Sequence, residues 1–156
     1  MVNVRRNCHR RTMESNLTPP EAIDRTVELD ASPARVWVAL ADPDGLASWF
    51  PDRVVGLVPE EGATGWLVWD RHGRYAIAVE WMEAGRRLVW RWARKPETPL
   101  DGGYNTTVEW TLTEREGGGT ILRLVESGFR TESDRQDNVG GWEHELGELV
   151  DHLATA

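Results

Sequence analysis

Hydrophobic and polar residues alternate along several short segments of the chain. A period of two is typical of β-strands that bury one face, and turns rich in glycine separate most of these segments. We therefore predict an antiparallel sheet built largely from hairpins. The predicted strands are Ile23–Leu29, Gly65–Asp70, Arg74–Trp81, Arg87–Trp92, Thr106–Thr113 and Thr120–Ser127.

Two short helices are predicted after the first strand. Ser32 is a favourable N-cap residue, and Pro33 suits the first helical position. The Asp-Pro-Asp-Gly segment at 42–45 is expected to end this helix and turn the chain. Residues 46–50 allow one more helical turn, which Pro51 ends.

The end of the chain has the period of an amphipathic helix. Ser133 or Asp134 is expected to cap it. Its apolar stripe consists of Trp142, Leu146, Leu149, Val150 and Leu153. No other predicted element is long enough to cover the apolar face of the sheet. We therefore expect an α+β fold in which bulky residues between helix and sheet can leave a cavity.

Composition indicates a single globular domain. The chain has 156 residues, of which 40% are hydrophobic and 28% charged. No segment approaches the roughly 20 apolar residues of a membrane-spanning helix. The net charge of −8 argues against nucleic-acid binding and against attraction to anionic membranes. The single cysteine, Cys8, excludes an internal disulfide.

Residues 1–22 differ from the rest of the chain. They contain four arginines against two glutamates and include Pro19-Pro20 near their end. We expect a disordered basic tail over 1–22 and a single domain over 23–156. Because the tail lacks the apolar segment of a secretory signal, we expect a cytoplasmic protein. Met13 is an alternative start, since all four arginines precede it.

The sequence offers no convincing metal or cofactor site. His144 and His152 lie eight residues apart, which is two turns of a helix, and no histidine pair has the i, i+4 spacing. Motifs that bind phosphates or dinucleotides are absent from the sequence, as is the G-x-S-x-G motif of hydrolases. We expect no metal and no cofactor.

Charged residues fall into two groups. Glu80, Arg91 and Glu109 occupy polar strand positions, where a solvated salt-bridge ladder is the alternative to an acid–base cluster. Glu126 shares the inward phase of the last strand and lies near the final helix. There it could orient a ligand or act on it as an acid or base. In the alternative, Glu126 anchors a hydrogen-bond donor of the helix: Arg135, Asn138 or the Trp142 N–H.

Tryptophan is the most informative residue type. The chain has nine Trp against two Phe and two Tyr, and most of these aromatic positions share the inward strand phase. Simple core filling is the alternative to a pocket with apolar walls. The candidate ligand-binding residues are Trp49, Phe50, Trp66, Tyr75, Ile77, Trp81, Trp90, Trp92, Trp110, Leu122, Leu124, Glu126, Asn138, Trp142 and Leu146.

Ordered sequence segments resemble a known family. They are Val36–Pro43, Trp49–Pro51, Leu88–Trp92, Gly118–Leu122, Glu126–Phe129 and the Asn138…Gly141-Trp142…Leu146…Leu149 pattern. Together they resemble the helix-grip, START-like (SRPBCC) superfamily, and within it the family named for the activator of the heat-shock protein 90 ATPase. The resemblance covers about residues 26–153.

The resemblance implies a curved antiparallel sheet wrapped around a long C-terminal helix. It implies three alternative functions: binding of a hydrophobic small molecule in an internal cavity, a cyclase- or aromatase-like enzyme using Glu126 or Tyr75, and a chaperone-partner module. A monomer or a homodimer is compatible with this architecture. Residues 46–50 and the loop 93–105 are the expected pocket mouth.

Overall fold

The computed structural model describes residues 20–154. Most of the basic tail, with Cys8, His9 and Met13, lies outside the described residues. The tail and the domain boundary at residue 23 therefore stay predictions.

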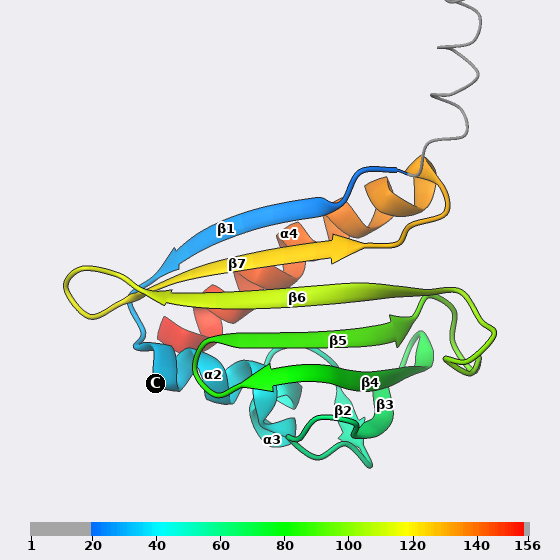
Figure 1. The fold of residues 1–156 in the computed structure, drawn as a ribbon, viewed down its shortest axis with the longest axis horizontal. Coiled ribbons are helices and arrows are strands. Elements are labelled where there is room, and N and C mark those ends of the chain that lie inside the picture. The colour runs from blue at the N-terminus through cyan, green and yellow to red at the C-terminus, as the bar shows by residue number, and fades with distance from the viewer. Residues whose placement is uncertain (1–19, 155–156) are drawn as a thin grey trace, which may run out of the picture.

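The described chain forms one seven-stranded antiparallel sheet in the order β1-β7-β6-β5-β4-β3-β2 (Figure 1). The strands are β1 (Ile23–Leu29), β2 (Arg53–Val55), β3 (Thr64–Trp69), β4 (Gly73–Glu83), β5 (Arg87–Ala93), β6 (Asn105–Glu114) and β7 (Thr120–Ser127). Six of them were predicted to within two residues at each end. The edge strand β2 was not, because three residues are too few to show a period.

Three helices lie behind the sheet in the view of Figure 1. They are α2 (Pro33–Ala41), α3 (Pro43–Ala47) and α4 (Glu132–Ala154). The long helix α4 crosses the sheet behind β7 and β6, α2 lies beside its C-terminal end, and α3 packs against α2 (Figure 1). This arrangement confirms the predicted helix-grip architecture. None of the helices in residues 20–154 is long and apolar enough to cross a membrane.

The two short helices are each capped by a side chain. Ser32 Oγ accepts from the Arg35 backbone N–H at 3.3 Å, as predicted for the start of α2. Asp42 Oδ2 accepts from the Gly45 N–H at 3.0 Å, so Asp42 caps α3. The prediction that this segment ends the first helix is confirmed, since α2 ends at Ala41 with Asp42 as its C-cap, but residues 43–45 begin α3 where a turn was expected. Since Pro43 needs no hydrogen-bond acceptor in a first turn, the segment starts a helix.

The predictions for α4 need two corrections. Thr131, rather than Ser133 or Asp134, supplies the cap, since Thr131 Oγ1 accepts from the Asp134 N–H at 3.0 Å. Val150 is 40% exposed, whereas the other residues of the predicted stripe are buried. At 100° per residue, position 150 lies about 80° from Trp142 around the helix axis, at the edge of the buried face.

Two tryptophans predicted to face inward lie on the outer face of the sheet. Pairing between β4 and β5 shifts between Val79 and Trp81, and this β-bulge leaves Trp81 43% exposed. On β3, Leu67 is fully buried, so its neighbour Trp66 faces outward. The Arg74 guanidinium lies 4.3 Å from the centre of the Trp66 ring.

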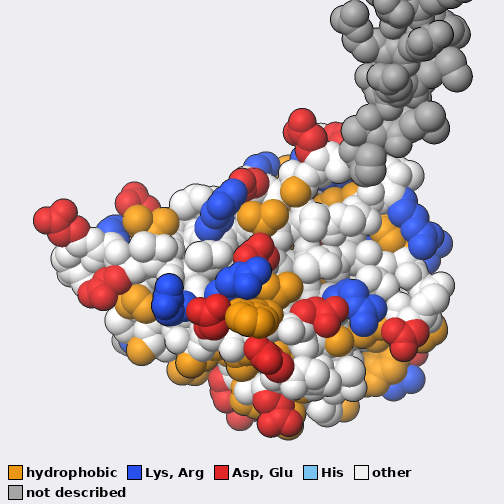
Figure 2. Space-filling model, viewed as in Figure 1, with side chains coloured by type: hydrophobic (Ala, Val, Ile, Leu, Met, Phe, Trp, Pro, Cys, Tyr) orange, Lys and Arg blue, Asp and Glu red, His pale blue; other side chains and the backbone are white. Residues whose placement is uncertain are grey.

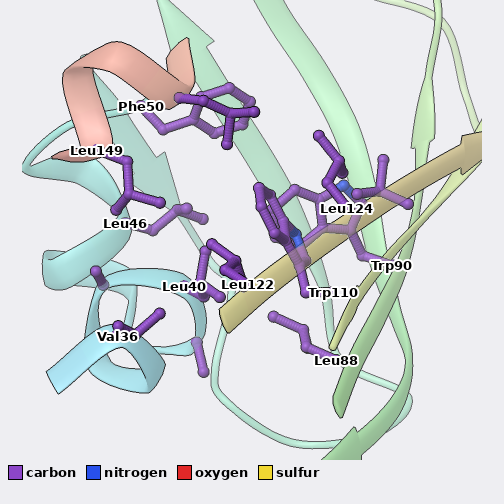
Figure 3. Packing of buried hydrophobic residues seen from close by; sticks show 14 of the residues in the cluster. Val36, Leu40, Leu46, Phe50, Leu88, Trp90, Trp110, Leu122, Leu124 and Leu149 are labelled. Carbon is purple, nitrogen blue, oxygen red and sulfur yellow. The ribbon is translucent and has the colours of Figure 1, made fainter. Parts of the chain in front are cut away.

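The core between sheet and helices is mainly aromatic and aliphatic (Figure 3). Phe50 contacts other aromatic rings of this core, with ring centroids of Trp49 at 5.0 Å and Trp142 at 5.4 Å. Trp90 and Trp110 are buried beyond it, and their rings meet edge to face at 5.8 Å. Simple core filling therefore accounts for several of the nine tryptophans.

The outer face of the sheet carries a mosaic of acidic, basic and hydrophobic side chains (Figure 2). Arg91 pairs with Glu80 at 2.8 Å, and Glu109 pairs with Arg87 on the neighbouring strand. All four side chains are partly exposed. These contacts fit the salt-bridge ladder better than an acid–base cluster.

Candidate functional site

A pocket of about 670 Å³ opens between α4 and the β3–β5 side of the sheet. This volume is within the range of small-molecule sites. Its lining residues come from the turn after α3, from β3 to β5 and from one face of α4. They are Phe50, Trp69, His72, Tyr75, Trp92, Ala93, Arg94, Asp137, Asn138, Gly141, Trp142 and Glu145.

Flat aromatic rings form the apolar walls. The rings of Phe50 and Trp142 are nearly parallel, at 12° and 5.4 Å between centroids. Trp92 stacks on Trp142 at 5.8 Å and 29°. Trp69 meets Tyr75 edge to face at 5.5 Å. These walls suit a planar apolar group, because aromatic surfaces stack on one another with offset faces.

The structure brings together five of the fifteen candidate residues at this pocket: Phe50, Tyr75, Trp92, Asn138 and Trp142. Seven others belong to the buried core: Trp49, Ile77, Trp90, Trp110, Leu122, Leu124 and Leu146. Trp66 and Trp81 lie on the outer face, and Glu126 is buried behind the pocket. Strand phase separates inward from outward positions, but it does not say which inward positions border a cavity.

Other lining residues were not among the candidates. Trp69 shares the inward phase of Leu67 on β3, so the alternation along this strand could have predicted that Trp69 faces inward. Asp137, Gly141 and Glu145 are spaced by four and share one face of α4, which helical periodicity could have revealed. His72 lies in the turn between β3 and β4, where sequence periodicity carries no such information.

Only the start of the loop 93–105 contributes to the pocket. Ala93 and Arg94 line it, together with Phe50 from the other expected part of the mouth. Farther along, Glu97 folds back onto Arg74, with its carboxylate 2.8 Å from the guanidinium. That ion pair lowers the pKa of the Glu97 carboxyl group. Glu97, Pro99, Leu100 and Asp101 of this loop border a separate depression, beside Trp66.

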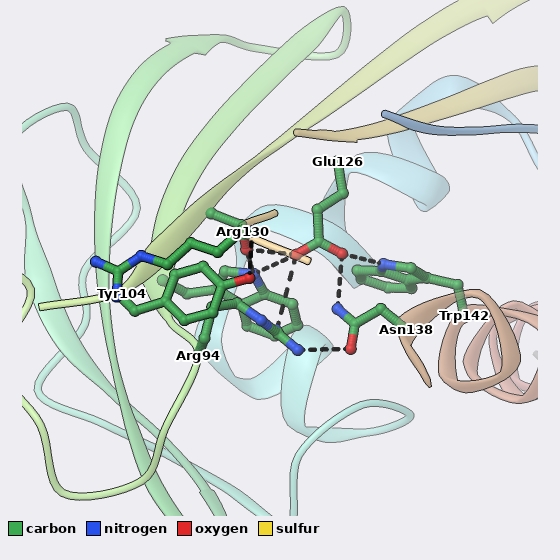
Figure 4. Close-up of polar contacts among 8 residues, drawn as sticks. Arg94, Tyr104, Glu126, Arg130, Asn138 and Trp142 are labelled. Carbon is green, nitrogen blue, oxygen red and sulfur yellow. Dashed lines mark hydrogen bonds and ion pairs between the residues drawn. The ribbon is translucent and has the colours of Figure 1, made fainter. Parts of the chain in front are cut away.

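Glu126 is the centre of a buried polar cluster (Figure 4). Its Oε1 accepts from Trp142 Nε1 at 2.7 Å and from Asn138 Nδ2 at 2.8 Å. Its Oε2 accepts from Trp92 Nε1 at 2.8 Å and from Thr106 Oγ1 at 2.6 Å. The side chain is 0% exposed. The carboxylate thus joins β5, β6 and α4 through four donors.

Arg94 completes this cluster on the pocket side. Its guanidinium Nη1 lies 3.8 Å from Glu126 Oε2, and Nη2 donates to Asn138 Oδ1 at 2.6 Å. The guanidinium also lies over the ring of Phe129, at 5.7 Å. The positive charge of Arg94 is therefore directed toward the buried carboxylate behind the pocket.

Four donors fill the acceptor sites of an ionised carboxylate. Glu126 therefore has no acceptor site left for a ligand in this arrangement, and the geometry favours the anchoring alternative. Of the three expected donors, Asn138 and Trp142 bind Glu126, whereas Arg135 pairs with Glu132 at 2.8 Å. Hydrogen bonds from the side chains of Arg135 and Gln136 lower the pKa of the exposed Glu132 carboxyl group to about 2.

Glu145 has the opposite environment. It lines the pocket, and its Oε2 is buried without a hydrogen-bond donor in the described part of the chain. Burial raises the pKa of Glu145 to about 7; the Glu148 carboxylate adds to the rise, and His144 opposes it. A carboxyl group with a pKa near neutrality can gain or lose a proton at physiological pH.

Within residues 20–154, no group of three or more His, Cys, Asp or Glu side chains is arranged to hold a metal ion.

A family model for the Activator of Hsp90 ATPase homolog 1-like protein matches residues 30–154. The chain belongs to this family. Its SRPBCC helix-grip architecture agrees with the sheet and the long α4 described above. A search of curated proteins finds no match.

Solved structures include several similar folds. DynU16, a protein in the dynemicin biosynthetic locus, is 28% identical, with a TM-score of 0.74 over 88% of this chain. This chain covers 48% of DynU16, so it spans about half of that protein's length. CalU16 from Micromonospora echinospora is 26% identical, with a TM-score of 0.68. The match covers 85% of this chain and 75% of the CalU16 chain.

The Aha1 dimer from Colwellia psychrerythraea shares the fold at 22% identity. Its TM-score is 0.71, over 86% of this chain and 96% of that one. The three solved structures thus share the helix-grip fold with this chain. The scaffold alone does not define a function, so the pocket carries the functional argument.

Proposed function

We propose that this protein binds a planar, largely apolar small molecule in the pocket between α4 and the sheet. The observation that carries the proposal is the pocket itself: about 670 Å³, walled by the flat rings of Phe50, Trp69, Tyr75, Trp92 and Trp142. Polar and ionisable side chains border the same space: His72, Arg94, Asp137, Asn138 and Glu145. A concave site that combines aromatic walls with polar side chains that can orient a ligand is characteristic of small-molecule binding.

The polar cluster supports the proposal by keeping the pocket preformed. Trp92 and Trp142 both donate to Glu126, so two of the wall rings are fixed in orientation without a ligand. Binding then costs little side-chain entropy, because these rings are already ordered.

Gly141 provides a way to close the pocket without disturbing the fold. It lines the pocket, and a Cβ atom at this position meets no atom of residues 20–154 within 4 Å. Gly147, on the same helix, has equally open surroundings but lies outside the pocket. Leucine at either position favours the helix over glycine by a similar amount.

The experiment compares wild type, Gly141→Leu and Gly147→Leu. Tryptophan fluorescence and thermal shift are recorded against a library of planar aromatic compounds. We expect saturable quenching and a raised Tm for wild type and Gly147→Leu, since a ligand that binds the folded state stabilises it. Gly141→Leu should lose at least tenfold in affinity. Compounds that bind all three proteins equally, or a complete absence of hits, would contradict the proposal.

A second candidate function is proton transfer to or from the bound molecule, as in a cyclase-like enzyme. The carboxyl group of Glu145 favours it, because it borders the pocket and its pKa is raised to about 7. Tyr75 faces the same space. For an identified substrate, Glu145→Gln should abolish turnover and leave binding nearly intact. Unchanged turnover would remove Glu145 from the mechanism.

The chaperone partner, the oligomeric state and the cytoplasmic location stay predictions.

A further inference from the structure

The ionisable groups around the pocket have unequal surroundings. Arg94 is the one Lys or Arg among the described lining residues, and its guanidinium already faces Glu126 and Asn138. Asp137 and Glu145 add two carboxylates from α4, one of them with a buried oxygen that no described residue donates to. Above the pKa of Glu145, the pocket and the cluster behind it therefore have an excess of negative charge.

The walls and the charge point to the same kind of ligand. Aromatic faces carry partial negative charge and attract cations placed over them. An ionised carboxylate beside such faces adds a Coulombic attraction that partial burial strengthens. From these two features we propose that the ligand is a planar aromatic molecule with an ammonium or similar cationic group, held over the pocket rings beside Glu145. This inference rests on the proposed ligand-binding function and specifies its ligand class.

Gly141 gives the cation room at this position. It lies one helical turn from both Asp137 and Glu145, on the same face of α4. The missing side chain leaves the space between the two carboxylates open, since an added Cβ would touch no atom of the described chain within 4 Å. A charged group can approach there while the ring system stacks on Trp92 and Trp142.

The proposal makes binding depend on pH through Glu145. The ionisable groups that share the pocket are His72, Tyr75, Arg94 and Asp137, and those beside Glu145 on α4 are His144 and Glu148. Glu145 must be ionised to attract the cation. With a pKa of about 7, its ionised fraction rises about tenfold from pH 6 to pH 8. The affinity for an amine should therefore rise by up to about tenfold over this interval.

The test uses three probes of similar shape and different charge: 2-naphthylmethylamine, 2-naphthylmethanol and 2-naphthoate. Calorimetric titrations at pH 6 and pH 8 compare wild type with Glu145→Gln and Glu143→Gln. Glu143 is exposed on α4 and does not line the pocket, so its replacement removes the same charge without touching the site.

We expect wild type and Glu143→Gln to prefer the amine over the alcohol by at least fivefold at pH 8, and the carboxylate to bind most weakly. Glu145→Gln should lose this preference and its pH dependence. At pH 6, binding of the amine should release protons, detected as a heat that depends on the ionisation enthalpy of the buffer.

Two results would overturn the inference, and they have different consequences. If the alcohol binds as tightly as the amine and Gly141→Leu blocks both, the preference for a cation is wrong while the proposed binding function stands. If none of the three probes saturates, or if Gly141→Leu has no effect on their binding, both proposals fail for this ligand class. A preference for the amine that persists in Glu145→Gln would also contradict the role of Glu145.

Discussion

Glu126 binds two tryptophans of the pocket wall and Glu145 lines the pocket itself, and the two residues differ in what their carboxylates contact. Glu126 is fully buried and accepts four hydrogen bonds. Glu145 is only partly buried, yet one of its oxygens has no donor among residues 20–154. Burial alone therefore does not decide the behaviour of a carboxyl group. The donors around it decide whether it anchors the fold or stays open to chemistry.

The largest expected effect tests Glu126 as an anchor. Glu126→Gln keeps the shape but turns an amide NH₂ group toward the surrounding donors. We expect the free energy of unfolding to fall by about 3 kcal/mol or more, because buried donors lose their acceptor. Urea unfolding followed by far-UV circular dichroism measures this. Glu143→Gln is the control, and an equally small loss in both variants would contradict the anchoring role.

A smaller effect is expected when one donor of the cluster is removed. Thr106 donates to Glu126 at 2.6 Å and accepts from Trp92 Nε1 at 2.9 Å. Thr106→Val retains the volume and removes both hydrogen bonds. We expect a loss of about 1–3 kcal/mol in the same unfolding assay. The partly exposed Thr107→Val on the same strand serves as the control and should change stability by less than about 0.5 kcal/mol.

Replacing Glu145 should change the free energy of unfolding in the opposite direction and raise it at high pH. Because its pKa is raised to about 7, the folded state binds more protons than the unfolded state between about pH 4.5 and pH 7. Its contribution to stability therefore falls as the pH rises through this interval. Glu145→Gln removes that decline.

We expect Glu145→Gln to be about 1–2 kcal/mol more stable than wild type at pH 8, and nearly equal to it at pH 4.5. Partial contact with solvent keeps this gain below the full value of the pKa shift. Urea unfolding at a series of pH values gives the difference curve. A stability difference that does not change with pH would show that Glu145 has an ordinary pKa.

The smallest expected effect concerns the exposed rim. Asp137 lines the pocket mouth but is largely in solvent. Asp137→Asn should change the unfolding free energy by less than about 0.5 kcal/mol. It should weaken the binding of 2-naphthylmethylamine less than Glu145→Gln does, since water screens its charge more strongly. A larger loss for Asp137→Asn would move the cation toward the rim.

Most of the fold could be predicted from the sequence. The strand β7 matches its predicted range, and the N-cap role of Ser32 is as expected, because period and capping chemistry are local properties. The failures have local causes as well. At Trp81 a β-bulge reverses the alternation, and the alternation itself does not reveal a bulge.

The candidate site was harder to predict. Strand phase predicted that Trp90 and Trp92 both face inward. Trp90 lies in the closed core, whereas Trp92 also borders the pocket. Both are inward positions of one strand. Which of them faces empty space depends on how α4 and the turn after α3 close over the sheet, and these segments are distant from β5 in sequence.

The sequence by itself determined six of the seven strands, most of the amphipathic stripe of α4, the negative charge and the resemblance to the Activator of Hsp90 ATPase homolog 1-like family. Those features depend on residue type and spacing along the chain. Only the tertiary structure decided that Glu126 accepts hydrogen bonds from three elements of the fold and that Glu145 borders the pocket with an oxygen to which no described residue donates. The physical reason is that the hydrogen bonding and chemistry of a carboxyl group depend on the donors and the solvent around it. For Glu126 these donors come from β5, β6 and α4, which only the folded chain brings together.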